Sequence, residues 1–234
     1  MKRRNFLKNT IGIGTVAAAT TLSSPALSKG KIKWKMITTW PKNFPGLGTG
    51  AQRIADSITA MSEGQLTVKL FAAGELVPAF ECFDAVRQDT AQMSHGMSYY
   101  WINKNKSTPF FAAVPGGLTA QEHNAWIHYG GGQDLWDELY ADFNVKGFLG
   151  GNTGVQMGGW FNKEINSLKD FKGLKMRMPG LGAEVINRMG ATAVSLPGGE
   201  IMPALQSGAI DATEWVGPWN DLAFGFYKVA NNYY

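Results

Sequence analysis

The sequence contains a single cysteine, Cys82, so it cannot form an intramolecular disulfide. Because Cys82 lies in the apolar pattern Phe80-Glu81-Cys82-Phe83, we expect a buried thiol rather than a reactive one. Long hydrophobic runs are also lacking, and the most apolar stretch, residues 11–22, is too short to span a bilayer comfortably. No run of consecutive Lys or Arg follows residue 4, which gives no support for nucleic-acid binding.

The chain has no net charge once the first 28 residues are left out of the count. Arg3-Arg4 precedes Phe6-Leu7-Lys8, an apolar segment follows, and Ala26-Leu27-Ser28 supplies a small-residue cleavage site. This pattern predicts a twin-arginine signal peptide and a periplasmic protein, with an uncleaved anchor as the alternative. The leader carries four of the 22 basic residues and no acidic one, which leaves 18 basic (22 − 4) against 18 acidic residues. The net charge of +4 therefore belongs to the leader alone.

Catalytic constellations are missing as well. His95, His123 and His128 do not have the spacing of metal ligands, and no serine elbow is present. The glycines of residues 46–51 have the wrong spacing for a dinucleotide fingerprint, and prolines interrupt the preceding turn. The sequence thus offers neither a nucleophile–base pair nor a metal-binding cluster.

Strands and helices alternate along the chain, which predicts an α/β fold with mostly parallel sheets. Expected strands in the first half are 33–38, 66–71 and 90–97, with helices at 49–61 and from about 75–78 to 87. Two further helices, 119–129 and 133–143, are separated by a triple glycine that we interpret as a helix break. Expected strands in the second half are 172–178, 192–196 and 209–213, with helices at 182–189 and 199–206.

The two halves also match in local sequence. Residues 74–80, GELVPAF, align with residues 199–205, GEIMPAL, with four identities. Such duplication predicts a two-lobed fold with a ligand between the lobes, and a single sheet built from both halves is the alternative. We assign 1–28 to the signal peptide, 29–150 to the first lobe with its connecting helices, and 151–234 to the second. The chain ends in an aromatic run without a turn signal, so we expect this second lobe to be incomplete at its C-terminus.

Polar residues at strand ends are the candidate site residues. Arg177 ends a strand just before Pro179-Gly180 and could clamp a carboxylate, although a surface arginine beside Lys175 would have the same pattern. Glu214 follows an apolar strand and could bind a metal, act as a general base or pair with a cation. Gln156 lies in a glycine-rich segment that we interpret as a strand, and its amide oxygen suits a hard cation.

At these residues the sequence resembles the solute receptors of tripartite ATP-independent periplasmic (TRAP) transporters, in particular the group that binds 2-oxo acids. Five segments carry the resemblance: residues 37–42, 73–79, 151–164, 173–182 and 208–221. The similarity covers nearly all of the chain after the leader. It departs from the family in length, since such receptors usually continue for roughly a hundred residues more.

The resemblance implies two α/β lobes that close on a monocarboxylate without catalysis and deliver it to a membrane permease. It assigns the substrate carboxylate to Arg177 and places Tyr99 or Tyr100 on the opposite side. A bridging cation, Na⁺ with Ca²⁺ as the alternative, would be held by Gln156, Glu214 and the Trp215 carbonyl. A homodimer through a further C-terminal segment is a possible assembly. The competing hypothesis is a periplasmic hydrolase or lyase that uses Glu214 as its general base.

Overall fold

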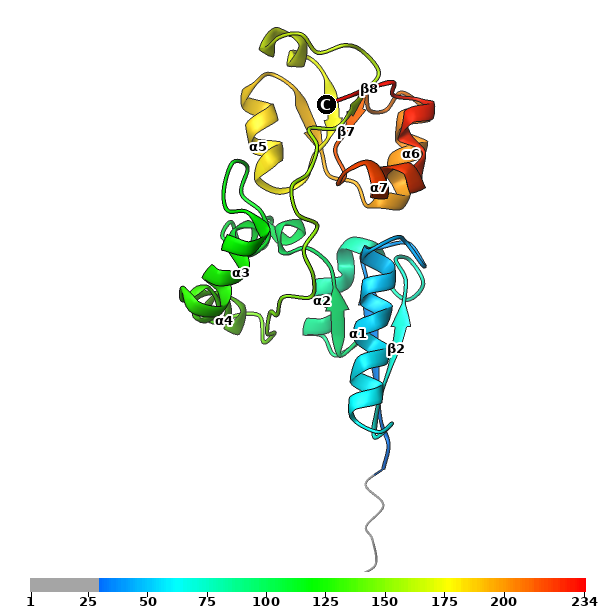
Figure 1. The fold of residues 1–234 in the computed structure, drawn as a ribbon, viewed down its shortest axis with the longest axis vertical. Helices are drawn as coiled ribbons and strands as arrows, with labels where there is room; N and C mark the ends of the chain where they lie inside the picture. The colour runs from blue at the N-terminus through cyan, green and yellow to red at the C-terminus, as the bar shows by residue number, and fades with distance from the viewer. Residues whose placement is uncertain (1–29) are drawn as a thin grey trace, which may run out of the picture. The chain divides into compact units, whose positions relative to one another are not determined.

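The computed structural model describes residues 30–234, so the predicted signal peptide lies outside the described residues. Residues 31–234 form one compact unit that contains two separate β-sheets (Figure 1). The alternative of a single sheet built from both halves is therefore wrong. None of the helices in residues 30–234 combines the length and the hydrophobicity needed to span a bilayer.

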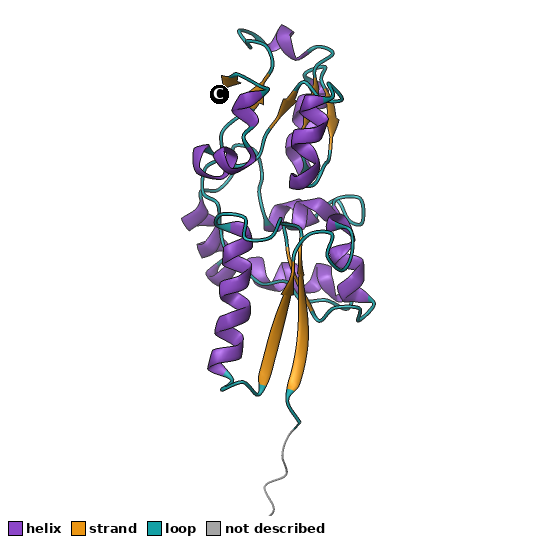
Figure 2. Cartoon of the chain, turned by 90° about the vertical axis from the view of Figure 1, so that its right-hand side faces the viewer, coloured by secondary structure: helices purple, strands orange, loops and turns teal. Residues whose placement is uncertain are grey.

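The first sheet consists of three parallel strands in the order β2-β1-β3. Two long strands of this sheet lie side by side in Figure 2. The strands are β1 (Ile32–Thr38), β2 (Leu66–Phe71) and β3 (Met93–His95). Helix α1 (Leu47–Met61) connects β1 to β2 and buries Ala51 and Ala55 against Met36 and Val68. Because successive side chains of a strand alternate between faces, the neighbouring Ile37 belongs to a different cluster on the opposite face.

The second sheet has five short strands in the order β6-β5-β7-β4-β8. Its strands are β4 (Trp160–Phe161), β5 (Lys175–Arg177), β6 (Thr192–Val194), β7 (Ala212–Thr213) and β8 (Asn232–Tyr233). Strands β5, β6 and β7 are parallel, whereas β4 runs antiparallel to both β7 and β8. Helices α5 (Gly180–Arg188), α6 (Gly198–Gln206) and α7 (Pro218–Phe224) accompany this sheet.

The two sheets share a topology, because the first has the order β2-β1-β3 and the second contains β6-β5-β7. The matching sequences at 74–80 and 199–205 nevertheless adopt different local structures. Gly74 lies in a turn with φ of +81°, and a 3₁₀ turn (Ala79–Glu81) precedes α2 (Cys82–Arg87). The predicted first-half helix therefore begins later than expected, whereas Gly199 already lies in helix α6. The duplication is thus visible in the strand order rather than in these segments.

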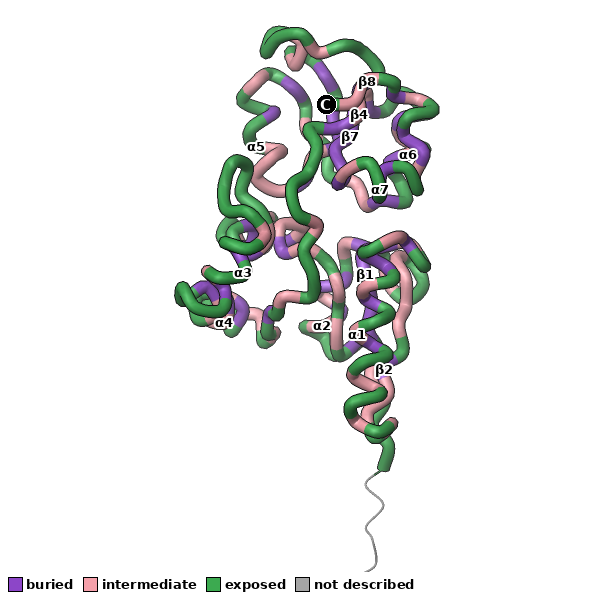
Figure 3. Tube along the Cα trace, viewed as in Figure 1, coloured by how far each residue is buried: buried purple, intermediate pink, exposed green. Residues whose placement is uncertain are grey.

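The glycine-rich segment 151–158 is not a strand, contrary to the sequence interpretation. Gly151 and Gly154 have φ values of +153° and +71°, which interrupt an extended ladder. The segment is largely exposed, as Figure 3 shows, and Gln156 lies on it. Strands β3, β5, β6 and β7 are likewise shorter than predicted.

The helical part between the sheets agrees with the sequence pattern. Helix α3 (Ala120–Tyr129) begins at a capping box formed by Thr119 and Glu122, and α4 (Gly132–Ala141) follows the glycine break. Their aromatic side chains pack with Cys82, which is buried and free, on one face of the first sheet. The prediction that Cys82 is buried is confirmed, and burial raises the pKa of its thiol to about 12.

Candidate functional site

Arg177 lies at the carboxyl end of β5 with only 1% of its surface exposed. Its Nη1 donates to the Glu214 backbone carbonyl (2.6 Å) and to Glu214 Oε2 (3.0 Å), and its Nε donates to the Leu196 carbonyl (3.2 Å). The alternative of a surface arginine is therefore wrong. Lys175, on the same strand, is exposed.

Glu214 directly follows β7 and is buried, and its carboxylate pairs with a cation, Arg177, which is one of the roles expected from the sequence. Burial raises the pKa of Glu214 to about 7, and the nearby Asp221 adds to the effect while Arg177 opposes it. Two buried atoms of the pair have no hydrogen-bond partner among the described residues, namely Glu214 Oε1 and Arg177 Nη2. Buried polar atoms of native proteins are rarely left unpaired, so this pair has the chemistry of a binding site for a polar ligand.

Aromatic side chains surround the Arg177–Glu214 pair. The Arg177 guanidinium lies 4.9 Å from the ring centroid of Trp215 and forms a cation–π contact. Tyr99 and Tyr100 belong to a 3₁₀ turn (Ser98–Trp101) that follows β3, and burial raises the pKa of both hydroxyls. They remain protonated at neutral pH and can donate hydrogen bonds.

The second sheet approaches Tyr99 closely through Gly180, at the start of α5. Gly180 has φ of +62°, and a Cβ at this position would lie 2.9 Å from the Cβ of Tyr99. A glycine is therefore required here both by the backbone conformation and by the space available. This contact joins the strand-end loops of the two sheets at the site.

A narrow cavity of about 10 Å³, roughly the space of one water molecule, brings the predicted residues together. Its lining comprises Trp40, Leu47, Met97, Tyr99, Tyr100, Gln156, Arg177, Trp215 and Val216. Five predicted substrate residues thus lie together, and Glu214 is connected to them through Arg177. Sequence reasoning missed Trp40, Leu47, Met97 and Val216 as lining residues. For Trp40 the available signal was its position directly after a strand end.

The acidic residues near the cavity limit what kind of cation the site could hold. Residues 30–234 contain no group of three His, Cys, Asp or Glu side chains placed to hold a metal. Asp221 accepts hydrogen bonds from the Val216 and Gly217 amides, Trp160 Nε1 and the Tyr233 hydroxyl, so its oxygens are occupied. In the described part of the chain, Glu214 Oε1 is the carboxylate oxygen of this pair of acids that has no hydrogen-bond partner. Gln156 donates through Nε2 to Thr153, which leaves its amide oxygen able to accept.

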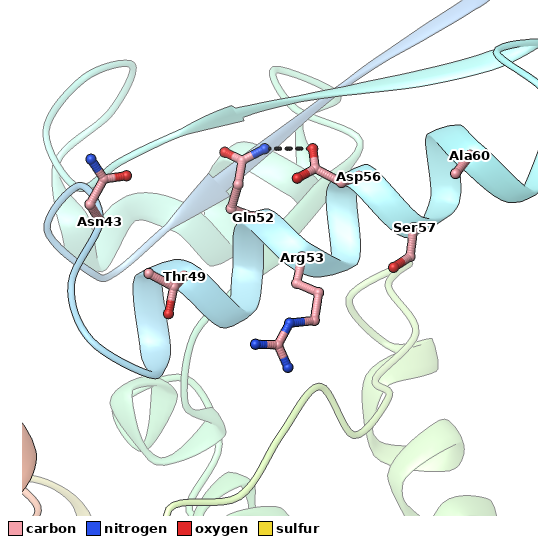
Figure 4. A pocket seen from close by; sticks show the side chains of 7 residues that line it. All are labelled: Asn43, Thr49, Gln52, Arg53, Asp56, Ser57 and Ala60. Atoms are coloured by element: carbon pink, nitrogen blue, oxygen red, sulfur yellow. Dashed lines mark hydrogen bonds between the residues drawn. The ribbon is translucent and has the colours of Figure 1, made fainter.

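A larger open groove of about 470 Å³ runs along the exposed face of α1 (Figure 4). Its lining residues are exposed and, apart from Ala60, polar, and Gln52 Nε2 already donates to Asp56 (2.8 Å). Within residues 30–234, this groove holds no buried, unpartnered polar atom, in contrast to the smaller cavity. We therefore place the functional site at Arg177 rather than in the larger groove.

Comparisons with known proteins identify the family of this chain. Residues 37–234 match the family model described as bacterial extracellular solute-binding protein, family 7. The chain is 47% identical over 240 residues to the monocarboxylate 2-oxoacid-binding periplasmic protein of Nostoc sp. PCC 7120, covering all of this chain and 65% of that protein.

Two solved TRAP periplasmic solute-binding proteins, each 46% identical, have similar structures. The protein from Pseudoalteromonas atlantica T6c, with bound sodium and pyruvate, has a TM-score of 0.85. The protein from Colwellia psychrerythraea, with bound calcium and pyruvate, has a TM-score of 0.84. Each match covers 87% of this chain and 62% of the other, so the chain spans less than two thirds of these relatives. The two-lobed α/β fold expected from the sequence is confirmed.

Proposed function

This chain belongs to family 7 of the bacterial extracellular solute-binding proteins, and on that premise we propose that it is the receptor of a TRAP transporter for a small 2-oxo monocarboxylate such as pyruvate. The observation that carries the proposal is the buried, unpartnered Nη2 of Arg177 at a cavity lined by Tyr99, Tyr100 and Trp215. A guanidinium with a free N–H suits a carboxylate.

We further propose that a cation, Na⁺ with Ca²⁺ as the alternative, binds together with the substrate. A substrate carboxylate beside the Glu214 carboxylate would be repelled unless a positive charge lies between them. Glu214 Oε1, the Gln156 amide oxygen and the Trp215 carbonyl are hard oxygen donors of the kind that either ion prefers. Because Asp221 is fully hydrogen bonded and only one carboxylate remains, the donor set favours the monovalent ion. Relatives with sodium and with calcium support both candidates.

Calorimetry on the metal-stripped full protein tests this proposal. We expect pyruvate to bind with one-to-one stoichiometry and to bind at least ten-fold more tightly when Na⁺ or Ca²⁺ is present. The Glu214→Gln variant, which keeps the shape but removes the charge, should lose the dependence on the cation. Binding that is indifferent to both ions would remove the cation from the proposal, and no binding of 2-oxo acids would reject the receptor.

The competing function is a hydrolase or lyase that uses Glu214 as a general base. The raised pKa of Glu214, about 7, suits a base, but one of its oxygens already accepts from Arg177. The relatives are binding proteins rather than enzymes, which favours the receptor. Chromatographic analysis of the ligand recovered after prolonged incubation separates the two, since a receptor returns the 2-oxo acid unchanged.

The partners and the location follow from the same family membership. Relatives are named periplasmic proteins, and we propose that this protein also acts in the periplasm and delivers its ligand to the membrane subunits of a TRAP permease. We propose export by the twin-arginine route, which is supported by Arg3-Arg4 and the following apolar segment. A homodimer through a longer C-terminal segment stays a prediction, as do the lobe boundaries at residues 150 and 151.

A further inference from the structure

His95 lies at the end of β3 and contacts two parts of the candidate site without lining the cavity. On one side, Trp40 Nε1 donates a hydrogen bond of 2.7 Å to His95 Nδ1. On the other, His95 Nε2 lies 3.4 Å from the Gly150 carbonyl oxygen. Gly150 packs directly against the imidazole, because a Cβ at this position would lie 3.0 Å from Nε2.

The chemistry of the indole fixes the protonation state of this histidine. The indole N–H of Trp40 can only donate, so His95 Nδ1 must be an unprotonated acceptor. The single proton of the neutral ring then resides on Nε2, where it can be donated to the Gly150 carbonyl. Burial lowers the pKa of His95, in agreement with a neutral imidazole.

The Trp40 indole lines the cavity, and its hydrogen bond to His95 fixes the position of the ring. Its side chain is 1% exposed, and its ring packs edge-on against Trp215 and at a tilt against Tyr100, with centroids 6.2 and 6.3 Å apart. The backbone of Trp40 is fixed separately by Thr38 Oγ1. The rotation of the indole, however, has His95 as its polar anchor among the described residues.

The second contact of His95 concerns the exposed segment that carries Gln156. Between residues 149 and 157 of the described chain, two hydrogen bonds join this segment to other elements. They are the contact of His95 with the Gly150 carbonyl and the bond from the Met157 amide to the Val216 carbonyl. His95 therefore touches both the Trp40 wall and the start of the Gln156 segment.

We propose that His95 is a positioning residue for the ligand site: it holds the Trp40 indole against Trp215 and Tyr100 and anchors the start of the segment that carries Gln156. This inference rests on the proposed function, since its consequence is tighter binding of a 2-oxo acid. Preorganised walls raise affinity because less conformational freedom is lost when the ligand binds.

The test compares His95→Leu, which has no acceptor, with His95→Asn, whose amide oxygen can take the place of Nδ1. Pyruvate affinity in the presence of Na⁺ is measured by calorimetry on the full protein, with the exposed His128→Leu as the matched control. We expect His95→Leu to weaken binding about three- to ten-fold, the loss of one hydrogen bond. His95→Asn should bind within about two-fold of the wild type, and His128→Leu should bind like the wild type.

A double-mutant cycle with Trp40→Phe shows whether His95 acts through the indole. Adding His95→Leu to Trp40→Phe should weaken binding by less than His95→Leu does in the wild type, because the bond to the indole is already gone and only the contact with Gly150 remains to be lost. Additive effects, wild-type affinity of His95→Leu, or equal losses in His95→Asn and His95→Leu would overturn the proposal. If His95→Leu does not fold, the comparison of His95→Asn with Trp40→Phe decides: the proposal requires the first to bind well and the second weakly.

A readout without ligand separates this inference from the proposed function. The Trp40 indole N–H resonance, assigned by its loss in Trp40→Phe, should exchange slowly with solvent in the wild type and in His95→Asn. In His95→Leu it should shift upfield and exchange faster. If this pattern is found and pyruvate does not bind the wild type, the proposed function fails while the anchor stands. If pyruvate binds and the resonance is indifferent to His95, the inference fails alone.

Discussion

The first and second sheets have the same order of parallel strands but contribute different chemistry to the site. The second sheet supplies the charged pair, Arg177 and Glu214, from the ends of β5 and β7. The first sheet supplies aromatic and apolar side chains that follow its strand ends, including Trp40, Tyr99 and Tyr100. The comparison teaches that a repeated topology fixes where a site forms, whereas its polarity is set by a few residues after each strand.

The contacts between the loops of the first sheet and those of the second are mostly aromatic, with few polar contacts. The Phe44 ring stacks on Phe224, with the ring centroids 4.4 Å apart, and lies edge-on against Trp215, with the centroids 5.9 Å apart. One side-chain hydrogen bond accompanies them, from Asn220 Nδ2 to the Pro45 carbonyl at 2.7 Å. Apolar packing thus dominates this interface, and substitutions on either side can measure how much each kind of contact contributes.

The largest effect is expected for Phe44→Ala. Phe44 is buried, and truncating a buried phenylalanine costs about 3–5 kcal/mol of unfolding free energy because a cavity remains. Urea unfolding measures the loss, with Phe110→Ala, whose side chain is half exposed, as a control expected to change stability far less. Equal losses of unfolding free energy in both variants would show that the aromatic contacts of Phe44 do not stabilise the protein more than a half-exposed phenylalanine does.

Arg177→Lys should have the next largest effect, on affinity rather than on folding. A lysine can pair with Glu214, but its compact ammonium cannot reproduce the planar arrangement of guanidinium N–H groups that would bind Glu214 and the substrate carboxylate together. Hydrogen bonds to charged groups are worth about 1.5–3 kcal/mol, so pyruvate binding should weaken roughly ten-fold or more. The exposed Arg188→Lys on α5 is the control for calorimetry. Unchanged affinity in Arg177→Lys would move the carboxylate clamp to another cation.

The pH dependence of stability should identify Glu214 as the buried acid. Its pKa rises from the ordinary 4.5 to about 7 on folding, so between these values the folded state binds more protons than the unfolded state. This contribution is fully present below pH 4.5 and is lost as pH rises through about 7, by at most about 1.4 kcal/mol per pH unit.

Glu214→Gln provides the comparison that isolates this effect. The lowered pKa of His95 produces a slope of opposite sign, which is present in both proteins and cancels in their difference. The stability of the wild type relative to Glu214→Gln should therefore fall with rising pH. A flat difference between pH 4.5 and 7 would contradict the raised pKa of Glu214.

The smallest effect is expected for Asn220→Ala. Loss of the bond to the Pro45 carbonyl should lower the unfolding free energy by about 1 kcal/mol, the usual net value of one hydrogen bond. Asn124→Ala, on the exposed face of α3, serves as the control in the same urea titration. A loss as large as that of Phe44→Ala would mean that the polar contact, rather than the aromatic packing, dominates the interface.

Much of the fold could be predicted from periodicity and turn residues. The bounds of β2 were predicted correctly, and the helix break at the triple glycine and the start of α3 near Thr119 followed from local signals. The residues around 74–80 and 151–158 were misassigned, because positive φ angles at Gly74, Gly151 and Gly154 override the apolar pattern. Apolar periodicity alone does not reveal a glycine's φ.

For the candidate site, the sequence identified Arg177, Gln156, Glu214, Trp215, Tyr99 and Tyr100, partly through the family resemblance, and the cavity lies where five of them meet. Their individual roles as ligands stay predictions. By itself the sequence determined the residue types at the strand ends and the α/β alternation, since both depend on neighbours within a few positions. Only the tertiary structure decided that Arg177 is buried against Glu214 and that His95 holds Trp40, 37 and 55 residues apart in the chain. Such pairings depend on strand order and on burial. Burial raises the pKa of the Glu214 carboxyl, and the Trp40 indole fixes the tautomer of His95, only because segments distant in the chain pack together.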